Sequence, residues 1–404
     1  MILKYLFGAI AQKAGEIPAG ENWEMTGAPN RTRAGPPKRS VLRQLRQAMN
    51  FLKTFDLDEV TAFIENTEAN QKTAAVERQR IEAAVRALSA EMAIWKQELP
   101  THQTGLLNIK NLGYELGRLL AERDLRRTVT RPVPVKLTSK LCVQDDFATD
   151  WLSYWCQELR TAPYYHRKIW ELCYICQVLF SEGKLAAGRR GLGFGCGQEP
   201  LPSVFAKYGV AVMATDLDQS RPEAEVWRST HQHAANAESF RRRDICSDEK
   251  LLSAIEFRSL DMNSIPQDFD GQFDFCWSAC ALEHLGSLAQ GLTFIERSLQ
   301  TLKPGGVAVH TTEFTMDKGE TIDNHPTVLY KSDHLIEFSQ KLQARGYEVV
   351  PYDFNTGGGI LDRFVDLPPW AHELYIPAQQ YAHLKLSIDG YTCTSVGMII
   401  RNPE

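Results

Sequence analysis

The sequence has 404 residues, of which 43% are hydrophobic and 24% are charged, and its formal net charge is −5. Because this length exceeds what one hydrophobic core usually supports, we expect two domains or one domain with an extension. The hydrophobic content excludes wholesale disorder. A nucleic-acid binder usually carries an excess of positive charge that attracts phosphates. This chain has a negative net charge, so no nucleic-acid partner is expected.

The cysteines and the apolar segments bear on location. The nine cysteines form an odd set without a regular framework, which favours reduced thiols over a secreted disulfide scaffold. The apolar start is short and lacks the cleavage site of a signal peptide, and no apolar stretch approaches the length that spans a bilayer. We therefore expect a cytoplasmic protein without a transmembrane segment.

The first 127 residues divide into a tail and a helical extension. Residues 1–40 are rich in glycine, proline and arginine, which predicts a flexible tail that is solvated or touches an anionic partner. In residues 41–127, apolar residues recur at steps of four and three from Ile81 to Leu99. This seam stops at Pro100 and resumes near Leu106, so we expect either a helical hairpin packed on the catalytic domain or a short coiled coil through which the chain forms a homodimer.

A proline-rich stretch, 128–135, marks the domain boundary, because each proline holds itself and its predecessor in extended conformations. In residues 136–404, helix-like and strand-like stretches alternate. We expect a helix over 149–180 and strands over 191–194, 210–214, 273–277 and 307–311. A further strand, 392–400, is expected to complete the edge of the sheet. The alternation predicts an α/β fold with a mostly parallel sheet covered on both faces.

The most specific motif is the run RGLGFGCGQEP from Arg190, which ends a strand with glycines and continues into a helix. Gly193, Gly195 and Gly197 let backbone amides approach a ligand closely, and the helix adds its positive N-terminal end. The GxGxxG spacing is absent, which argues against a nicotinamide-dependent oxidoreductase. The next strand ends at Asp216, where a carboxylate can accept both hydroxyls of a ribose, and Asp218 is the alternative.

These residues resemble the class I S-adenosylmethionine (SAM)-dependent methyltransferases over roughly residues 185 to 350. The resemblance continues with SLDM from Ser259, with FDFCWSACALEHL from Phe273, and with LKPGGVAV from Leu302. It implies a doubly wound, Rossmann-like α/β fold and SAM as the cofactor. At the family level it also implies an association with bacterial surface-polysaccharide biosynthesis.

The resemblance implies a set of cofactor-binding residues. In this set Asp216 would hold the ribose, Asp261 would accept from the adenine amine, and Met262 would supply a backbone or apolar contact. The family usually has an acid where Gly193 stands and a glycine where Glu199 stands. Glu199 either replaces the missing acid or is a glutamate favoured by the helix dipole. The full set is Gly193, Phe194, Gly195, Gly197, Glu199, Asp216, Leu217, Asp261, Met262 and Ser278.

Methyl transfer to a hydroxyl needs a base. The candidates are His284, His310 and Glu313, all expected at the carboxyl ends of strands, where open α/β sheets bind ligands. His284 has the alternative of packing beside the cofactor. Upstream, the residues 166–168 (HRK) either contact the SAM carboxylate or an anionic acceptor, or are exposed helix charges.

Three residues of the sequence bear on metal binding. Glu283, His284 and His325 distantly resemble the metal-binding set of small-RNA 2'-O-methyltransferases. That set has another glutamate three residues before the first, where this chain has Cys280, a poor ligand for magnesium. We therefore expect no metal.

The C-terminal segment, 351–404, is expected on the acceptor side. Its stretch from Gly357 to Trp370 carries two acids, an arginine and an aromatic residue, which suits a polar acceptor such as a sugar or forms a structural loop. The sequence thus predicts methyl transfer to a small or carbohydrate-like acceptor, at oxygen. The alternative is a catalytically silent scaffold that binds a partner through its helical extension.

Overall fold

The computed structural model describes residues 71–125, 127–221, 233–370 and 381–404. The expected tail, 1–40, and the first part of the expected helical extension lie outside the described residues. The chain divides into two units, Met1–Leu107 and Asn108–Glu404, and each is considered by itself.

The described part of the extension is the single helix α4 (Gln71–Asp124). It passes Pro100 without the expected interruption, because one proline removes one backbone N–H and bends a helix without having to end it. Toward its C-terminal end, Lys110 and Tyr114 are buried, whereas Ile109 and Leu112 are exposed. No described helix is long and apolar enough to cross a membrane.

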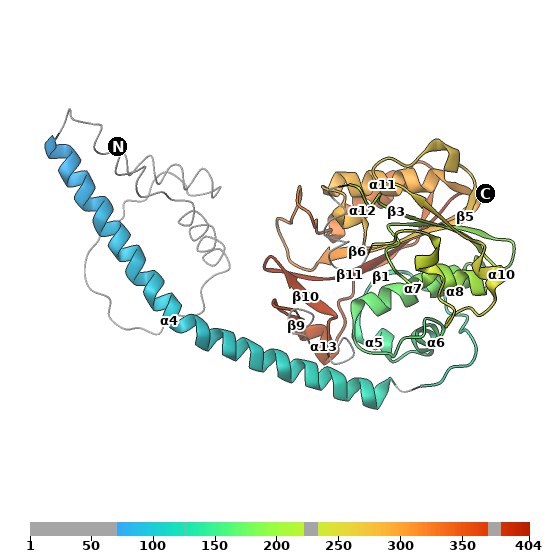
Figure 1. The fold of residues 1–404 in the computed structure, drawn as a ribbon, viewed down its shortest axis with the longest axis horizontal. Coiled ribbons are helices and arrows are strands. Elements are labelled where there is room, and N and C mark those ends of the chain that lie inside the picture. Colours follow the sequence, from blue (N-terminus) through green and yellow to red (C-terminus); the bar gives the residue numbers. More distant parts are fainter. Residues whose placement is uncertain (1–70, 126, 222–232, 371–380) are drawn as a thin grey trace. The chain divides into compact units, whose positions relative to one another are not determined.

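The second unit is built on one mixed sheet (Figure 1). Five neighbouring strands are parallel, in the spatial order β4, β3, β2, β5 and β6, and β11 pairs with β6 in the antiparallel direction. The expected doubly wound, mostly parallel sheet of the class I methyltransferase type is therefore confirmed. These strands are β2 (Arg190–Phe194), β3 (Ala211–Asp216), β4 (Ile255–Ser259), β5 (Phe273–Ala279), β6 (Leu302–Thr315) and β11 (Tyr391–Arg401).

The position of β11 differs from the expected one. This strand lies between β6 and β1 (Ser139–Leu141), in the interior of the sheet and not at its edge. Eight consecutive residues of β11, 393–400, are buried, as is typical of a strand covered on both faces. A strand of this kind has no alternating pattern, so its sequence does not report whether it is central or peripheral. The smaller strands are β7 (Glu348–Val349), β8 (Tyr352–Asp353), β9 (Val365–Asp366) and β10 (Lys385–Ile388).

Helices cover both faces of the sheet (Figure 1). One hydrophobic core lies under α6 (Asp150–Glu158), α7 (Arg167–Ser181) and α8 (Leu201–Lys207). The other lies under α11 (Leu288–Gln300) and α12 (Ser332–Gln343). The remaining helical segments are α5 (Gln144–Phe147), η2 (Ala237–Phe240), α10 (Glu249–Leu252), η3 (Gln267–Phe269), η4 (Leu282–His284) and α13 (Ile360–Arg363).

The helix expected over 149–180 is two helices, α6 and α7. Arg160 adopts a positive φ of 55° after α6, and Pro163 follows in the connection. Each helix begins at a side-chain cap: Thr149 accepts from the Leu152 N–H, and His166 accepts from the Lys168 N–H. The break sets the start of α7 beside the carboxyl ends of the central strands.

Candidate active site

The glycine loop after β2 packs tightly on its surroundings. A Cβ atom on Gly193 would lie 2.3 Å from the Trp277 ring, and one on Gly195 would lie 2.9 Å from Ala281. Gly195 and Gly197 have positive φ values of 58° and 53°, which other residues rarely adopt. Glycine at these positions therefore lets the chain pass close to Trp277 and Ala281 and turn at the carboxyl end of β2.

Asp216 lies at the end of β3 beside this loop. Its Oδ1 accepts from the Leu217 N–H at 2.8 Å, and its Oδ2 accepts from the Ala234 N–H at 3.0 Å. Partial burial raises the pKa of Asp216 above its ordinary value. Asp218, by contrast, is exposed and binds Ser220 at 2.8 Å through a local turn. The two candidates thus differ in setting, and Asp216 is the one held against the loop.

Asp261 and Met262 follow β4. Asp261 accepts from the Asn263 N–H at 2.9 Å and lies 3.4 Å from Arg221. Met262 is buried, and its sulfur would lie 3.1 Å from a Cβ atom on Gly195. The ends of β2, β3 and β4 therefore bring these predicted cofactor residues to one edge of the sheet.

Glu199 lies just before α8, and its Oε1 accepts from the Trp277 Nε1–H at 2.7 Å. Burial of the carboxyl group raises the pKa of Glu199 to about 8, despite that hydrogen bond. At neutral pH the group therefore holds its proton until a cation or another donor approaches it.

Three predicted residues have side chains in the core under α11. His310 Nδ1 lies 2.8 Å from the Ser278 hydroxyl, and its Nε2 lies 3.2 Å from the Ser298 hydroxyl. Burial lowers the pKa of His310 to about 3. Phe194 packs edge-on against Phe294, with ring centroids 5.1 Å apart. Any ligand contact of Phe194 or Ser278 is therefore left to the backbone.

His284 lies in η4, after β5. Its Nδ1 lies 2.8 Å from the Pro326 carbonyl and 3.3 Å from the Thr327 hydroxyl. Its Nε2 lies 3.9 Å from Glu283 Oε1. The ring is thus held between η4 and the segment that precedes α12.

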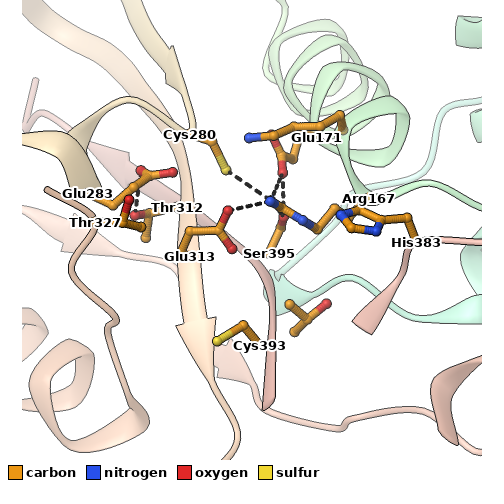
Figure 2. Close-up of polar contacts among 12 residues, drawn as sticks. Arg167, Glu171, Cys280, Glu283, Thr312, Glu313, Thr327, His383, Cys393 and Ser395 are labelled. Carbon is orange, nitrogen blue, oxygen red and sulfur yellow. Dashed lines mark hydrogen bonds and ion pairs between the residues drawn. The ribbon is translucent and has the colours of Figure 1, made fainter. Parts of the chain in front are cut away.

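A buried charged cluster, here called the Arg167 cluster, consists of Arg167, Glu171, Cys280, Glu283 and Glu313 (Figure 2). Arg167 Nη1 donates to Glu171 Oε1 at 3.1 Å and lies 3.7 Å from the Cys280 sulfur. Its Nη2 pairs with Glu313 Oε1. Arg167 and Glu171 share one face of α7 because they are one turn apart, and the other three follow or end the neighbouring strands β5 and β6.

Each carboxylate of this cluster has one oxygen without a hydrogen-bond partner among the described residues: Glu171 Oε2, Glu283 Oε1 and Glu313 Oε2. Lys168 lies 3.5 Å from the first of these. Burial raises the pKa of Glu313 to about 7, against the opposing effect of Arg167. Three carboxylates thus face two cations, and the cluster still accepts hydrogen bonds.

Among the described residues, one group has the spacing of a metal site. It consists of Cys280, Glu283 and Glu313, whose ligand atoms lie within 4.8 Å of one another. This is a different set from the one that the sequence suggested, which contained His284 and His325. The Arg167 guanidinium contacts two of the three, so a cation already offsets their charge. The expectation of no metal stays a prediction.

Residues 192–310 match the family described as a methyltransferase domain. The chain is a SAM-dependent methyltransferase. The matched range contains the glycine loop, Asp216, Asp261 and His284, and it ends at His310. No curated protein matches the sequence of this methyltransferase.

Solved structures that resemble the methyltransferase differ from it widely in sequence. A proposed sarcosine dimethylglycine methyltransferase from Galdieria sulphuraria is 16% identical, with 57% of this chain and 83% of that chain covered and a TM-score of 0.29. Phosphoethanolamine N-methyltransferase 2 from Haemonchus contortus, in complex with SAM, is 14% identical, with coverages of 57% and 52% and a TM-score of 0.32. A SAM-dependent methyltransferase from Mesorhizobium loti is 15% identical, with coverages of 55% and 95% and a TM-score of 0.32. The chain thus spans about half the length of the Haemonchus enzyme, and these scores carry no argument about its acceptor.

The residues at the loop fit SAM, the cofactor of the methyltransferase. Two glycines with positive φ make the turn at the end of β2, and a partly buried carboxylate, Asp216, stands at the end of the next strand. These residues are among those that the sequence predicts for the cofactor, and their individual roles stay predictions.

Sequence reasoning did not name most of the Arg167 cluster. The sequence suggests Arg167 as a contact of the SAM carboxylate or of an anionic acceptor, or as an exposed charge; the structure buries it in ion pairs with Glu171 and Glu313. Glu171 has no place among the residues that the sequence predicts for the site. Cys280 and Glu283 were weighed for metal binding alone. Glu171 lies in an apolar helix pattern, where a single glutamate among buried residues is the one available signal.

Proposed function

We propose that this methyltransferase transfers a methyl group to a hydroxyl oxygen of a small, carbohydrate-like acceptor. The observation that carries the proposal is a set of three buried carboxylate oxygens in the Arg167 cluster that make no hydrogen bond among the described residues; one of them, Glu171 Oε2, has Lys168 at 3.5 Å. Glu283 follows β5 and Glu313 lies near the end of β6, whereas Glu171 reaches the cluster from α7. The glycine loop is close, since a Cβ atom on Gly195 would lie 2.9 Å from Ala281, the neighbour of Cys280. A methyl acceptor bound at this cluster would find, on several sides, oxygen atoms that can accept its hydrogen bonds.

The hydrogen-bonding capacity favours a neutral molecule with several hydroxyl groups. A buried polar atom left without a partner costs about 1–3 kcal/mol, so each donor that reaches one of these oxygens recovers part of that cost. A polyhydroxyl acceptor supplies several such donors without adding a net charge. An anionic acceptor would be repelled by Glu171, Glu283 and Glu313, although Arg167 and Lys168 offset part of their charge.

The two halves of the proposed site have separate roles. The glycine loop, Asp216 and Asp261 bind the cofactor, which supplies an electrophilic methyl group when it is bound. The Arg167 cluster holds the acceptor, and much of the rate can come from such positioning alone. The roles of His284, His310 and Glu313 as bases stay predictions.

The broader setting is part of the same proposal. We keep the expectation that the enzyme is bacterial and cytoplasmic and that its acceptor belongs to surface-polysaccharide biosynthesis, as the resemblance implies. The C-terminal segment, 351–404, supports an acceptor role because its strand β11 carries Ser395, whose hydroxyl lies 3.1 Å from Arg167.

The test is an acceptor screen with the purified enzyme and ¹³C-methyl-labelled SAM. Free sugars, nucleotide sugars and amino sugars are compared, and the carbon-13 shift of the product methyl distinguishes oxygen from nitrogen. We expect an O-methyl product, and we expect Glu283→Gln to raise KM for that acceptor while leaving SAM affinity unchanged. A methyl group found on nitrogen, or activity confined to acceptors without hydroxyls, would overturn the proposal.

Self-association through α4 is a second, independent proposal. Ile109 and Leu112 are 63% and 73% exposed, which is unusual for large apolar side chains three residues apart on one helix. We expect a homodimer in sedimentation equilibrium, and a monomer for the double variant Ile109→Glu, Leu112→Glu. A wild-type chain that remains monomeric at all concentrations would refute the idea.

A further inference from the structure

A second buried acid–base pair lies beside the Arg167 cluster. His383 Nδ1 lies 2.7 Å from Asp366 Oδ2. The Asp366 side chain is fully buried, and the His383 side chain keeps 10% of its surface exposed. Figure 2 places His383 next to Arg167, whose backbone N–H donates to the His383 carbonyl at 3.1 Å. The pair therefore flanks the cluster proposed to hold the acceptor.

The Asp366 carboxylate is fixed from a second side. The Tyr114 hydroxyl lies 2.9 Å from Oδ1 and 3.0 Å from Oδ2, and Lys110 forms an ion pair with Oδ1. Both donors come from the C-terminal half of α4. With its oxygens held in this way, Asp366 can accept from the Nδ1–H of His383 in one orientation of the ring.

The imidazole of His383 has aromatic neighbours on several sides. It stacks on His166 with ring centroids 4.9 Å apart, and Tyr381 and Trp370 meet it edge-on at 6.0 Å and 6.4 Å. The described residues provide no hydrogen-bond partner for Nε2. Because Asp366 holds a proton on Nδ1, the lone pair of the neutral ring is on Nε2.

We propose that His383 is the general base of the methyl transfer and that Asp366 is its positioning residue. The inference rests on the proposed methylation of a hydroxyl. In the balanced step the acceptor O–H proton goes to His383 Nε2, the oxygen forms the bond to the methyl carbon, and the carbon–sulfur bond breaks with its electron pair on sulfur. The imidazolium that results is adjacent to the Asp366 carboxylate.

The surrounding charges suit this role. Burial lowers the pKa of His383, with Arg167 and Lys110 acting in the same direction and Asp366 opposing them. His166, on the stacked side, also has its pKa lowered by burial, so it adds no positive charge at neutral pH. His383 is therefore neutral in the pH range where a base must accept a proton. His310 is less suited, because both of its nitrogens are engaged in the core.

The first test needs no turnover. The ten histidines are labelled with ¹⁵N, and the His383 signal in the SAM-free enzyme is assigned by its loss in His383→Asn. We expect a protonated Nδ1 and an unprotonated Nε2 at neutral pH, and a mixture of tautomers in Asp366→Asn. A His383 ring protonated on Nε2 in the wild type would overturn the proposal, whatever the acceptor is.

The second test is kinetic, with the acceptor found by the screen. His383→Asn keeps a side-chain N–H for Asp366, so it preserves the anchoring contact and removes only the base. We expect kcat to fall by roughly 10²-fold or more, with KM and SAM affinity little changed. In a plot of kcat against pH, the fall at acidic pH should vanish in His383→Asn. In Asp366→Asn it should move to lower pH, because the Asp366 charge raises the pKa of His383.

The matched control is His334→Asn, which removes a histidine of α12 and should leave both kcat and its pH profile unchanged. A merely structural role for the pair would lower the unfolding midpoint of His383→Asn without changing the pH profile. If an O-methyl product forms and the fall at acidic pH persists in His383→Asn, the base assignment fails and the proposed function stands. If only N-methyl products form, the proposed function fails while the tautomer result still decides whether the pair is organised as described.

Discussion

Replacing Asp216 by alanine tests the cofactor half of the site most directly. The carboxylate accepts from the backbone N–H groups of Leu217 and Ala234 at 2.8 Å and 3.0 Å. Each oxygen retains a further lone pair for a ribose hydroxyl. Asp216→Ala removes these acceptors together and leaves the rest of the glycine loop in place.

The expected loss follows from the kind of bond. A hydrogen bond to a charged group contributes roughly 1.5–3 kcal/mol, so losing two of them weakens binding by at least about 3 kcal/mol. Because about 1.4 kcal/mol corresponds to a factor of ten, Kd for SAM should rise by roughly 100-fold or more. The released backbone groups of Leu217 and Ala234 can bind water, so the loss of folding stability should be smaller than the loss of affinity.

The assay is calorimetric titration of SAM into the wild type, Asp216→Ala and the control Asp218→Ala. Asp218 lies two residues away, is exposed, and among the described side chains accepts from Ser220 in its own turn, so its removal should leave Kd within a few-fold of the wild type. Circular dichroism shows whether both variants fold. An Asp216→Ala variant that is folded and binds SAM with unchanged affinity would refute the placement of the ribose.

Three further changes test the charges and the packing around the site. Glu199 has a pKa of about 8 in the folded state against 4.5 ordinarily, so folding stability should fall as pH rises through that interval; Glu199→Gln should remove this slope in urea unfolding. Arg167→Met leaves buried carboxylates without their cation and should cost about 3–5 kcal/mol in the same assay, whereas Arg189→Met, at a half-exposed ion pair, should cost about 0–1 kcal/mol. Gly193→Ala forces the Trp277 ring to move, so it should destabilise the fold by about 1–3 kcal/mol and weaken SAM binding. Unchanged affinity and stability would mean that the contact between Gly193 and Trp277 is looser than the structure indicates.

The residues that we propose for the cofactor could be predicted because each of them is recognisable from its local sequence. Gly195 and Gly197 take positive φ values that their residue type suits, and Asp216 ends a strand that is recognisable by itself. A parallel sheet then brings the ends of neighbouring strands together without further information. The order of those strands and the interior place of β11 are not local properties, and the uniformly buried β11 carries no pattern that distinguishes centre from edge.

Side-chain direction explains why His310 and Glu313 differ although they are near neighbours on β6. Residues an odd number of positions apart on a regular strand point to opposite faces, so the two side chains separate. His310 enters the core under α11, and Glu313 meets Arg167 from α7 on the other face. The sequence placed both at the end of one strand, and only the register of the sheet assigns each to a face.

The acceptor half could not be predicted for a different reason. Arg167, Cys280, Glu313 and His383 come from segments separated by many residues, and no spacing between them is informative. Burying such ionisable groups opposes folding, since the desolvation of each ion costs several kcal/mol and is only partly repaid by pairing. In the Arg167 cluster this desolvation cost is only partly offset, because one oxygen on each of its three glutamates makes no hydrogen bond among the described residues. A stable core would gain by replacing these groups with apolar ones, which is why we propose that a bound molecule completes their hydrogen bonds.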